Sequence, residues 1–317
     1  MPLAAGPALG ASPGGSKRPS TPPAGPVKPW PEQARPAEPV RPRVWTAFLA
    51  VLASQVGAGI GALVVVFAVL GTAVAAGSGR PDLGMLNRVM SRPGVFLVLA
   101  GLGALASGAV ALAAAWLGRE PAATRLGLVR GAAGGGSALL AAAGALGLAL
   151  TYGALTSALK VRPAGPSALI ERAVSAAAGP GREGLGLFLL AVVCLALVPP
   201  LCEEMLFRGY VQRRLVQRWG PAGVVVTAFL FGLVHLDRLQ SPHAFLLGLF
   251  LGWVTLRAGS IRPAIVAHTA VNGWAVVAGR LGLADGMKGG LAVRAAVGLA
   301  AFALALALLA RRPALAV

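Results

Sequence analysis

Repeated long apolar runs constrain the fold of this chain more than any other feature. Segments long enough to cross a bilayer as helices follow one another along most of the sequence. A backbone in lipid must satisfy its own hydrogen bonds, and these runs lack the alternation of barrel strands, so we predict helices. Only 12% of the residues are charged, against about 25% in a typical soluble domain. The sequence therefore predicts an all-α, polytopic transmembrane bundle.

About eight apolar segments are predicted to span the membrane, and their many Gly and Ala residues favour close helix packing. They cover residues 44–76, 93–117, 131–158, 184–201, 222–236, 243–256, 263–278 and 291–310. The composition divides the chain into four regions. These are a basic tail rich in Pro, Gly and Ala that we predict to be disordered (1–43), N-terminal transmembrane helices (44–183), a core region (184–280) and a C-terminal transmembrane helix (281–317).

The basic residues indicate topology rather than a nucleic-acid partner. The formal charge of +18 comes from Lys and Arg residues scattered among the segment ends and the tail. The basic tail favours a cytoplasmic N-terminus for a multi-pass protein of the cell inner (plasma) membrane. We expect no cleavable signal peptide, because its apolar region would lie within the first ~30 residues. The predicted partners are therefore the lipid bilayer and a membrane-bound substrate, and not nucleic acid.

Two adjacent carboxylates, Glu203 and Glu204, follow an apolar run in the stretch PLCEEMLFRG, in a chain with only ten acidic residues. Residues four apart share one face of a helix, so Glu204 is predicted to reach Arg208. Glu203 then points about 100° away from that face. We hypothesise that Glu204 is held by an ion pair and that Glu203 is left to do chemistry.

The residues around this acidic pair suggest how its helix is arranged. Pro199 and Pro200 are predicted to kink or restart the helix, which places both glutamates near a positive helix N-terminus. Beyond the pair, Gln212 to Trp219 mix basic, polar and apolar residues. This pattern predicts an amphipathic continuation at the membrane interface.

Two further polar sets lie inside apolar segments, namely His235 alone and His268 with Asn272. His235 follows Phe231 by four residues, and His268 precedes Asn272 by four, so each pair projects from one helix face. Polar side chains within membrane helices usually face the protein interior or a water-filled cavity. Each set also has a structural interpretation: an interfacial ion pair for the glutamates, a histidine bonded to a carbonyl, or an interhelical hydrogen bond. His243 lies in a short polar turn and is predicted to be solvated or to start a helix.

The motifs EExxxR, FxxxH and HxxxN occur in this order on separate predicted helices, with Pro-Leu before the glutamates and Phe-Arg-Gly after them. In these features the chain resembles the CPBP family of intramembrane endopeptidases. That family contains CAAX prenyl proteases of the Rce1 type and the bacterial (Abi) proteins grouped with lysostaphin resistance protein A and bacteriocin self-immunity. The resemblance covers roughly residues 184–279 and implies that the core region 184–280 is a protease.

The resemblance also implies a mechanism, in which an activated water hydrolyses a peptide bond. Glu203 would be the general base, and His235 would hold the water. His268 and Asn272 would stabilise the oxyanion that forms when the water attacks. The predicted catalytic residues are Glu203, Glu204, His235, His268 and Asn272, and the predicted supporting residues are Arg208 and Phe231.

Two cofactor interpretations remain open at this stage. Glu203, His235 and His268 have the ligand types of a three-ligand zinc site with a water in the fourth position. They do not form the HExxH helix of common zinc proteases, and the family has been described both as metalloproteases and as glutamate-dependent enzymes. We favour a metal-free mechanism that requires no cofactor, with zinc as the alternative.

The leading functional hypothesis is an intramembrane endopeptidase that processes a membrane-associated protein or peptide, as CAAX proteases do. The alternative is a non-catalytic bacteriocin-immunity or binding protein on the same membrane scaffold. A third hypothesis is a transporter or channel, in which the inward polar residues line a pathway. Substitution of Glu203 separates the first hypothesis from the other two, because only hydrolysis requires a base at this position.

Overall fold

The structure of the protein is a computed structural model that describes residues 43–77, 82–118, 120–130, 135–283 and 290–312. Within these ranges the regular secondary structure is entirely helical, as predicted. The predicted disordered tail, residues 1–43, lies outside the described residues apart from its last residue.

The first part of the bundle consists of helices whose starts follow from local sequence. Pro93 and Pro166 each occupy the first turn of a helix, where a missing N–H costs nothing. The side chain of Asp82 caps another by accepting a hydrogen bond from the backbone N–H of Met85. The helices are α1 (Trp45–Ala75), α2 (Leu83–Met90), α3 (Pro93–Trp116), α4 (Ala122–Arg125), α5 (Gly135–Ala158) and α6 (Pro166–Ala177).

The second part contains one long helix with two π-helical stretches, here called η1 and η2, followed by shorter helices. The long helix consists of α7 (Gly181–Ala191), η1 (Val192–Leu197), α8 (Val198–Glu204), η2 (Met205–Gln212) and α9 (Arg213–Trp219). The helices after it are α10 (Ala222–Leu233), α11 (Gln240–Ala258), α12 (Arg262–Arg280) and α14 (Leu291–Ala310).

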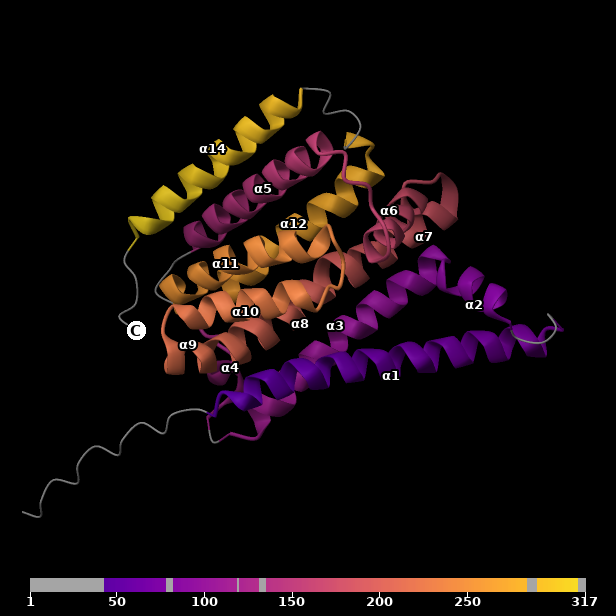
Figure 1. The fold of residues 1–317 in the computed structure, drawn as a ribbon, viewed down its shortest axis with the longest axis horizontal. Helices are drawn as coiled ribbons and strands as arrows, with labels where there is room; N and C mark the ends of the chain where they lie inside the picture. The colour runs from indigo at the N-terminus through magenta and orange to yellow at the C-terminus, as the bar shows by residue number, and fades with distance from the viewer. Residues whose placement is uncertain (1–42, 78–81, 119, 131–134, 284–289, 313–317) are drawn as a thin grey trace, which may run out of the picture. The chain divides into compact units, whose positions relative to one another are not determined.

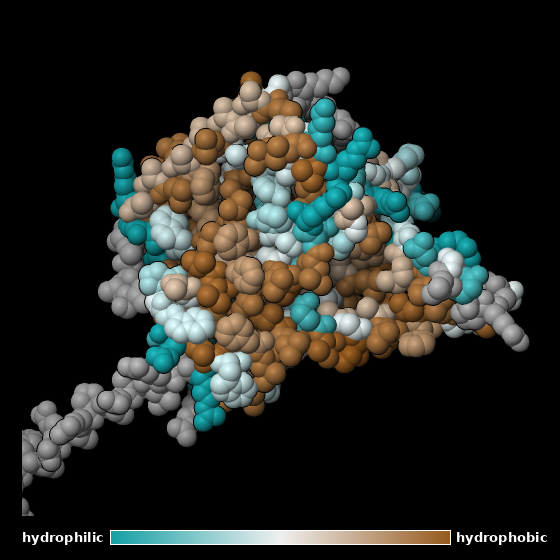
Figure 2. Space-filling model, viewed as in Figure 1, coloured by the Kyte–Doolittle hydropathy of each residue, from teal (hydrophilic) through white to brown (hydrophobic). Residues whose placement is uncertain are grey.

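The chain is a multi-pass membrane protein, although a count of about eight spans is not confirmed. Each of the eight predicted apolar segments contains a helix. Among the described residues, five helices are long and apolar enough to cross a membrane: α1, α3, α5, the helix from Gly181 to Trp219, and α14. The apolar helix α10 has only 12 residues, and α11 and α12 carry polar residues. Figure 2 shows apolar residues over most of the face in view, with hydrophilic residues mainly toward the helix ends.

The helices pack side by side in a row, and α8, which carries Glu203 and Glu204, lies near the middle (Figure 1). α14 packs on α5, α5 on α12, α12 on α8, α8 on α3, and α3 on α1. The pair α10 and α11 packs beside this row, against η2 and α12. α8 is therefore flanked by α3 and α12 from distant parts of the sequence, and α10, which precedes His235, packs on the adjoining η2.

Close approach of α3 to the glutamate helix depends on two glycines. A Cβ atom at Gly101 would lie 2.9 Å from Sγ of Cys194, and one at Gly108 would lie 2.6 Å from Sγ of Cys202. Both thiols are buried and free. The two cysteines thus act as small apolar side chains that fit against bare backbone, and they bring α3 against the helix that carries the glutamates.

Candidate active site

Glu203 and Glu204 lie inside a continuous helix of 39 residues, and not at the start of a new helix. The predicted restart at Pro199 and Pro200 is therefore wrong. Leu197, just before the prolines, keeps helical angles of φ −107° and ψ −54°. The wider π-helical turn of η1 precedes the prolines and relieves the clash that a proline ring makes with the preceding turn of an α-helix. The glutamates consequently have no free helix N-terminus beside them.

The two prolines leave one backbone carbonyl without a helical donor. In an α-helix the carbonyl of Leu195 would accept the N–H of residue 199, and in a π-helix that of residue 200. Both residues are prolines and have no N–H. The side-chain amide of Asn272 on α12 donates to this carbonyl instead, at 2.9 Å. This hydrogen bond joins α12 to η1 and fixes the position of Asn272.

Glu204 belongs to a fully buried charged cluster. Its Oε1 accepts a hydrogen bond from Nη1 of Arg208 at 2.8 Å, as the four-residue spacing predicts. The same oxygen lies 2.9 Å from Nδ1 of His268 on α12. The side chains of Glu204 and Arg208 are both 0% exposed, and the guanidinium stacks over the ring of Phe231, 4.4 Å from its centroid. A buried charge requires such pairing, so this cluster fixes the orientation of the His268 ring.

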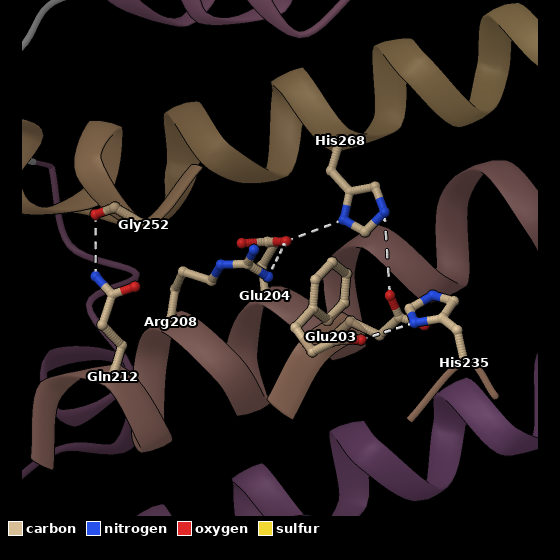
Figure 3. Close-up of polar contacts among 8 residues, drawn as sticks. Glu203, Glu204, Arg208, Gln212, His235, Gly252 and His268 are labelled. Atoms are coloured by element: carbon tan, nitrogen blue, oxygen red, sulfur yellow. Dashed lines mark hydrogen bonds and ion pairs between the residues drawn. The ribbon is translucent and has the colours of Figure 1, made fainter. Parts of the chain in front are cut away.

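Glu203 differs from its neighbour in having no hydrogen-bond partner within the described part of the chain. Its side chain is 20% exposed, and its Oε2 lies 4.0 Å from Nε2 of His268. Figure 3 shows His268 between the two glutamates, with one ring nitrogen toward each. The two carboxylates therefore have separate environments: one is buried in an ion pair, and the other is open to the cavity described below.

His235, in the turn just after α10, presents only one ring nitrogen to the site. Its Nδ1 lies 2.7 Å from the backbone carbonyl of Phe231, the residue four positions earlier. A carbonyl only accepts hydrogen bonds, so Nδ1 carries a proton and Nε2 of the neutral ring has a free lone pair. The structural interpretation of His235 as a carbonyl-bonded histidine holds for Nδ1 and leaves Nε2 available. The ring of Phe231 packs edge to face against two histidine rings. Its centroid lies 5.1 Å from that of His235 and 5.8 Å from that of His268.

A cavity of about 450 Å³ brings four of the five predicted catalytic residues together. Glu203, His235, His268 and Asn272 line it, from α8, the turn after α10, and α12. Glu204 is not among the lining residues and lies buried behind them. Small and apolar side chains from α1, α3 and α6 form much of the remaining wall, including Ala58, Phe96, Ala100, Gly103, Ile170 and Val174. The site is a polar cluster at one side of a mainly apolar chamber.

Residues 185–274 match the family model described as Type II CAAX prenyl endopeptidase Rce1-like. This segment belongs to the Rce1-like family. The Rce1-like domain extends from α7 into α12 and contains every residue of the predicted catalytic and supporting sets. No curated protein and no solved structure matches the chain. Helices α1 to α6 and α14, which complete the bundle, lie outside the matched segment.

His243 was predicted to be solvated or to start a helix, and the structure bears out the second alternative, because His243 lies in the first turn of α11. It lines the same cavity as His235 and His268, and its Nε2 is buried. The polar residues next to it suggested an exposed turn, whereas its ring packs against Tyr152 of α5. Contacts of this long range leave no signal in the local sequence.

Gln212 of the Rce1-like domain was predicted to lie at an interface and is instead only 1% exposed. It follows Glu204 and Arg208 at successive four-residue steps, so all three share one helix face. Its Nε2 donates to the backbone carbonyl of Gly252 on α11 at 3.0 Å (Figure 3). A Cβ at Gly252 would lie 2.6 Å from Oε1 of Gln212 and 2.7 Å from Cγ1 of Val224. Only glycine therefore leaves room for this side chain.

Replacing Gly252 with alanine should lower the free energy of unfolding by about 1–3 kcal/mol, because the new methyl group overpacks the helix contact and displaces Gln212. The melting temperature of the purified protein in detergent measures this effect. Gly153→Ala is the matched control, because a Cβ at Gly153 would meet nothing within 4 Å. Equal melting temperatures for the two variants would contradict the proposed fit.

The described residues do not fit the predicted three-ligand zinc site. No group of three or more His, Cys, Asp or Glu side chains among them is arranged to hold a metal ion. Nδ1 of His268 faces Glu204, and Nδ1 of His235 faces a carbonyl, so each ring offers the Rce1-like site only its Nε2. Independence from a metal cofactor stays a prediction.

Proposed function

We propose that this protein is an intramembrane endopeptidase that hydrolyses a peptide bond of a membrane-associated protein or peptide. The observation that carries the proposal is the carboxylate of Glu203. It shares one cavity with His235, His268 and Asn272, and no described residue donates a hydrogen bond to it. A carboxylate in this setting is suited to accept a proton from water. The family match over residues 185–274 supports the same reaction class.

In the proposed first step, Glu203 removes a proton from a water molecule while the water oxygen attacks the peptide carbonyl carbon. The lone pair on Nε2 of His235 accepts the second hydrogen of this water and orients it. Because Nδ1 of His235 donates to the carbonyl of Phe231, the ring is held in the tautomer that this task requires. Glu203 then passes its proton to the leaving nitrogen as the carbon–nitrogen bond breaks, which returns the site to its starting state.

The negative charge on the former carbonyl oxygen is assigned to two donors on α12. Asn272 uses one amide hydrogen on the carbonyl of Leu195, and its second hydrogen remains for the oxyanion. His268 can donate from Nε2 while Nδ1 faces Glu204 if the ring carries both protons, and the carboxylate of Glu204 compensates that positive charge. Loss of one such donor typically costs about 100-fold or more in rate.

We infer that the substrate is a peptide that ends in a prenylated CAAX sequence. The matching family model is described as a CAAX prenyl endopeptidase. The apolar walls that α1, α3 and α6 contribute to the cavity suit a substrate with a large apolar part.

A comparison of membranes tests the function for any substrate that the cell contains. Cells that produce the wild-type chain and cells that produce Glu203→Gln are compared by mass spectrometry of protein termini. New termini should appear only with the wild-type chain. Identical termini, combined with equal protection of both cell lines against a bacteriocin, would overturn the proposal in favour of the non-catalytic immunity function.

Exhaustive chelation of the purified protein should leave the hydrolysis rate unchanged, because the proposed base, water holder and oxyanion donors are all side chains. The rate is measured with a fluorogenic peptide before and after dialysis against a chelator. A zinc protease with known chelator sensitivity serves as the control for metal removal. Loss of activity that added zinc restores would instead establish a metal-dependent mechanism.

A further inference from the structure

A third histidine, His243, lines the cavity without a role in the mechanism above. Its Nε2 is buried and has no hydrogen-bond partner among the described residues. Buried polar atoms in proteins are nearly always paired, and an unpaired one costs about 1–3 kcal/mol. The imidazole of His243, in the wall of the cavity that also holds Glu203, is therefore suited to bind a group that enters with the substrate.

The position of His243 is fixed by an aromatic contact with a tyrosine that is itself anchored. Tyr152 of α5 packs against the ring with centroids 5.1 Å apart. The hydroxyl of Tyr152 donates to the backbone carbonyl of Leu239 at 2.8 Å, which ties the tyrosine to the chain just before α11. His243 therefore lies in the cavity wall in a preorganised position, which reduces the entropic cost of binding a group there.

Hydrogen bonds to Asp237 hold the start of α11, the helix that carries His243, in place. The carboxylate of Asp237 accepts hydrogen bonds from the backbone N–H groups of Leu239 and Gln240, both at 2.8 Å, and from that of Ser167 at 2.9 Å. Burial raises the pKa of Asp237, but the backbone hydrogen bonds outweigh it and hold the pKa below its usual value. The carboxylate therefore stays ionised and anchors the first turn of α11 to α6.

Gln240 provides a second hydrogen-bonding group beside His243. The two residues are three apart in the first turn of α11, so their side chains lie on the same face. Both line the cavity that holds Glu203 and Asn272. The imidazole and the carboxamide together can donate and accept hydrogen bonds, as a peptide group requires.

We propose that His243 and Gln240 form a subsite that binds a backbone amide group of the substrate next to the scissile bond. The proposal rests on the proposed function. A peptide that enters this chamber exchanges water for mainly apolar walls, so each of its N–H and C=O groups needs a partner. The catalytic residues serve the scissile amide alone, and the first turn of α11 supplies partners for an adjacent one.

Peptide binding to the inactive variant Glu203→Gln tests the subsite without catalysis. The probe is a fluorescent, farnesylated peptide ending in a CAAX sequence, and the readout is its Kd by anisotropy in detergent. His243→Phe in this background keeps an aromatic ring against Tyr152 but removes the nitrogen, and should raise Kd about tenfold. His243→Gln should recover part of the affinity, because its carboxamide again offers hydrogen bonds.

Matched controls separate binding from structural damage. Gln240→Leu should also raise Kd, whereas Gln217→Leu should not, because Gln217 is exposed on α9 and does not line the cavity. All variants should melt within the experimental error of their parent. If His243→Phe leaves Kd unchanged, or raises it only together with a lowered melting temperature, the subsite assignment is overturned.

A series of ester-containing peptides identifies the amide that is bound. Replacing one amide by an ester removes its N–H and weakens its carbonyl as an acceptor. At one position next to the scissile bond, the ester should weaken binding to the parent but not to His243→Phe, because the two changes remove the same interaction. Additive losses at every position would overturn the proposal.

Peptide binding tests the subsite, and the comparison of membranes tests the proposed function, so the two can fail independently. No detectable binding of the prenylated peptide to Glu203→Gln would overturn the subsite for this substrate class. The membrane comparison described above does not depend on that peptide, so it decides separately whether the protein hydrolyses peptide bonds at all.

Discussion

Replacing Glu203 with glutamine should reduce kcat for peptide hydrolysis by about a thousandfold, because the amide cannot accept the proton of the attacking water. Glutamine has nearly the same shape as glutamate, and Glu203 is partly exposed to the cavity and makes no hydrogen bond within the described chain. The substitution should therefore leave the melting temperature and the Kd for substrate close to the wild-type values. Single-turnover rates with the fluorogenic peptide, together with thermal unfolding, measure both effects.

Glu183→Gln is the matched control for this experiment. Glu183 lies on the same long helix, in the first turn of α7, and is exposed. Its substitution should leave the rate at the wild-type level. If Glu203→Gln retains more than a small fraction of the activity, the assignment of Glu203 as the base is wrong, whatever the fate of the other residues.

Replacing Glu204 with glutamine should lower the free energy of unfolding by about 3–5 kcal/mol, because it leaves the guanidinium of Arg208 buried without a countercharge. Glu204 is adjacent to Glu203, yet its substitution is expected to reduce stability, whereas substitution of Glu203 is expected to reduce the rate. Its Oε1 holds both Arg208 and His268, and its side chain is fully buried. Activity should fall as well, since the ring of His268 loses its orienting partner.

The double variant Glu204→Gln/Arg208→Gln distinguishes a charge effect from a packing effect. Removing both charges should recover much of the lost stability, because no unpaired ion is then buried. The stability of the three proteins is compared by their unfolding midpoints in detergent. A double variant less stable than Glu204→Gln would contradict this explanation, and so would a Glu204→Gln variant as stable as Glu203→Gln.

Interactions within one helix could be predicted from the sequence, because they depend only on local spacing. Glu204 and Arg208 are four residues apart and pair as that spacing requires. The apolar segments were found for the same reason, since helix formation in lipid follows from composition and length. The three motifs also predicted that Glu203, Glu204, His235, His268 and Asn272 meet around one cavity. All of them line it except Glu204, which is buried in its ion pair.

Interactions between distant helices could not be predicted in this way. Asn272 donates to a carbonyl 77 positions away, and Gln212 to one 40 positions away. Neither partner is visible as a side chain in the sequence, because each acceptor is a backbone oxygen. The polar neighbours of His243 predicted either a solvated residue or a helix start, and they gave no sign of its ring contact with Tyr152 of α5.

The number of spans was uncertain for a related physical reason. The helices α11 and α12 carry polar residues that line the cavity, including His243, His268 and Asn272. These residues reduce the hydropathy on which a span is recognised, although they face the interior. Polar groups that serve a site thus weaken the signal by which their own helices are identified.

The carbonyl left bare by the double proline has a consequence for biogenesis. It enters the bilayer when the glutamate helix inserts, and Asn272 is translated only 77 residues later. An unsatisfied backbone group in hydrocarbon costs several kcal/mol, so capture of α12 is favoured as soon as the ribosome releases it. That capture also delivers His268 to Glu204. The proposed active site is therefore incomplete in the nascent chain until α12 docks, because His268 and Asn272 both lie on that helix.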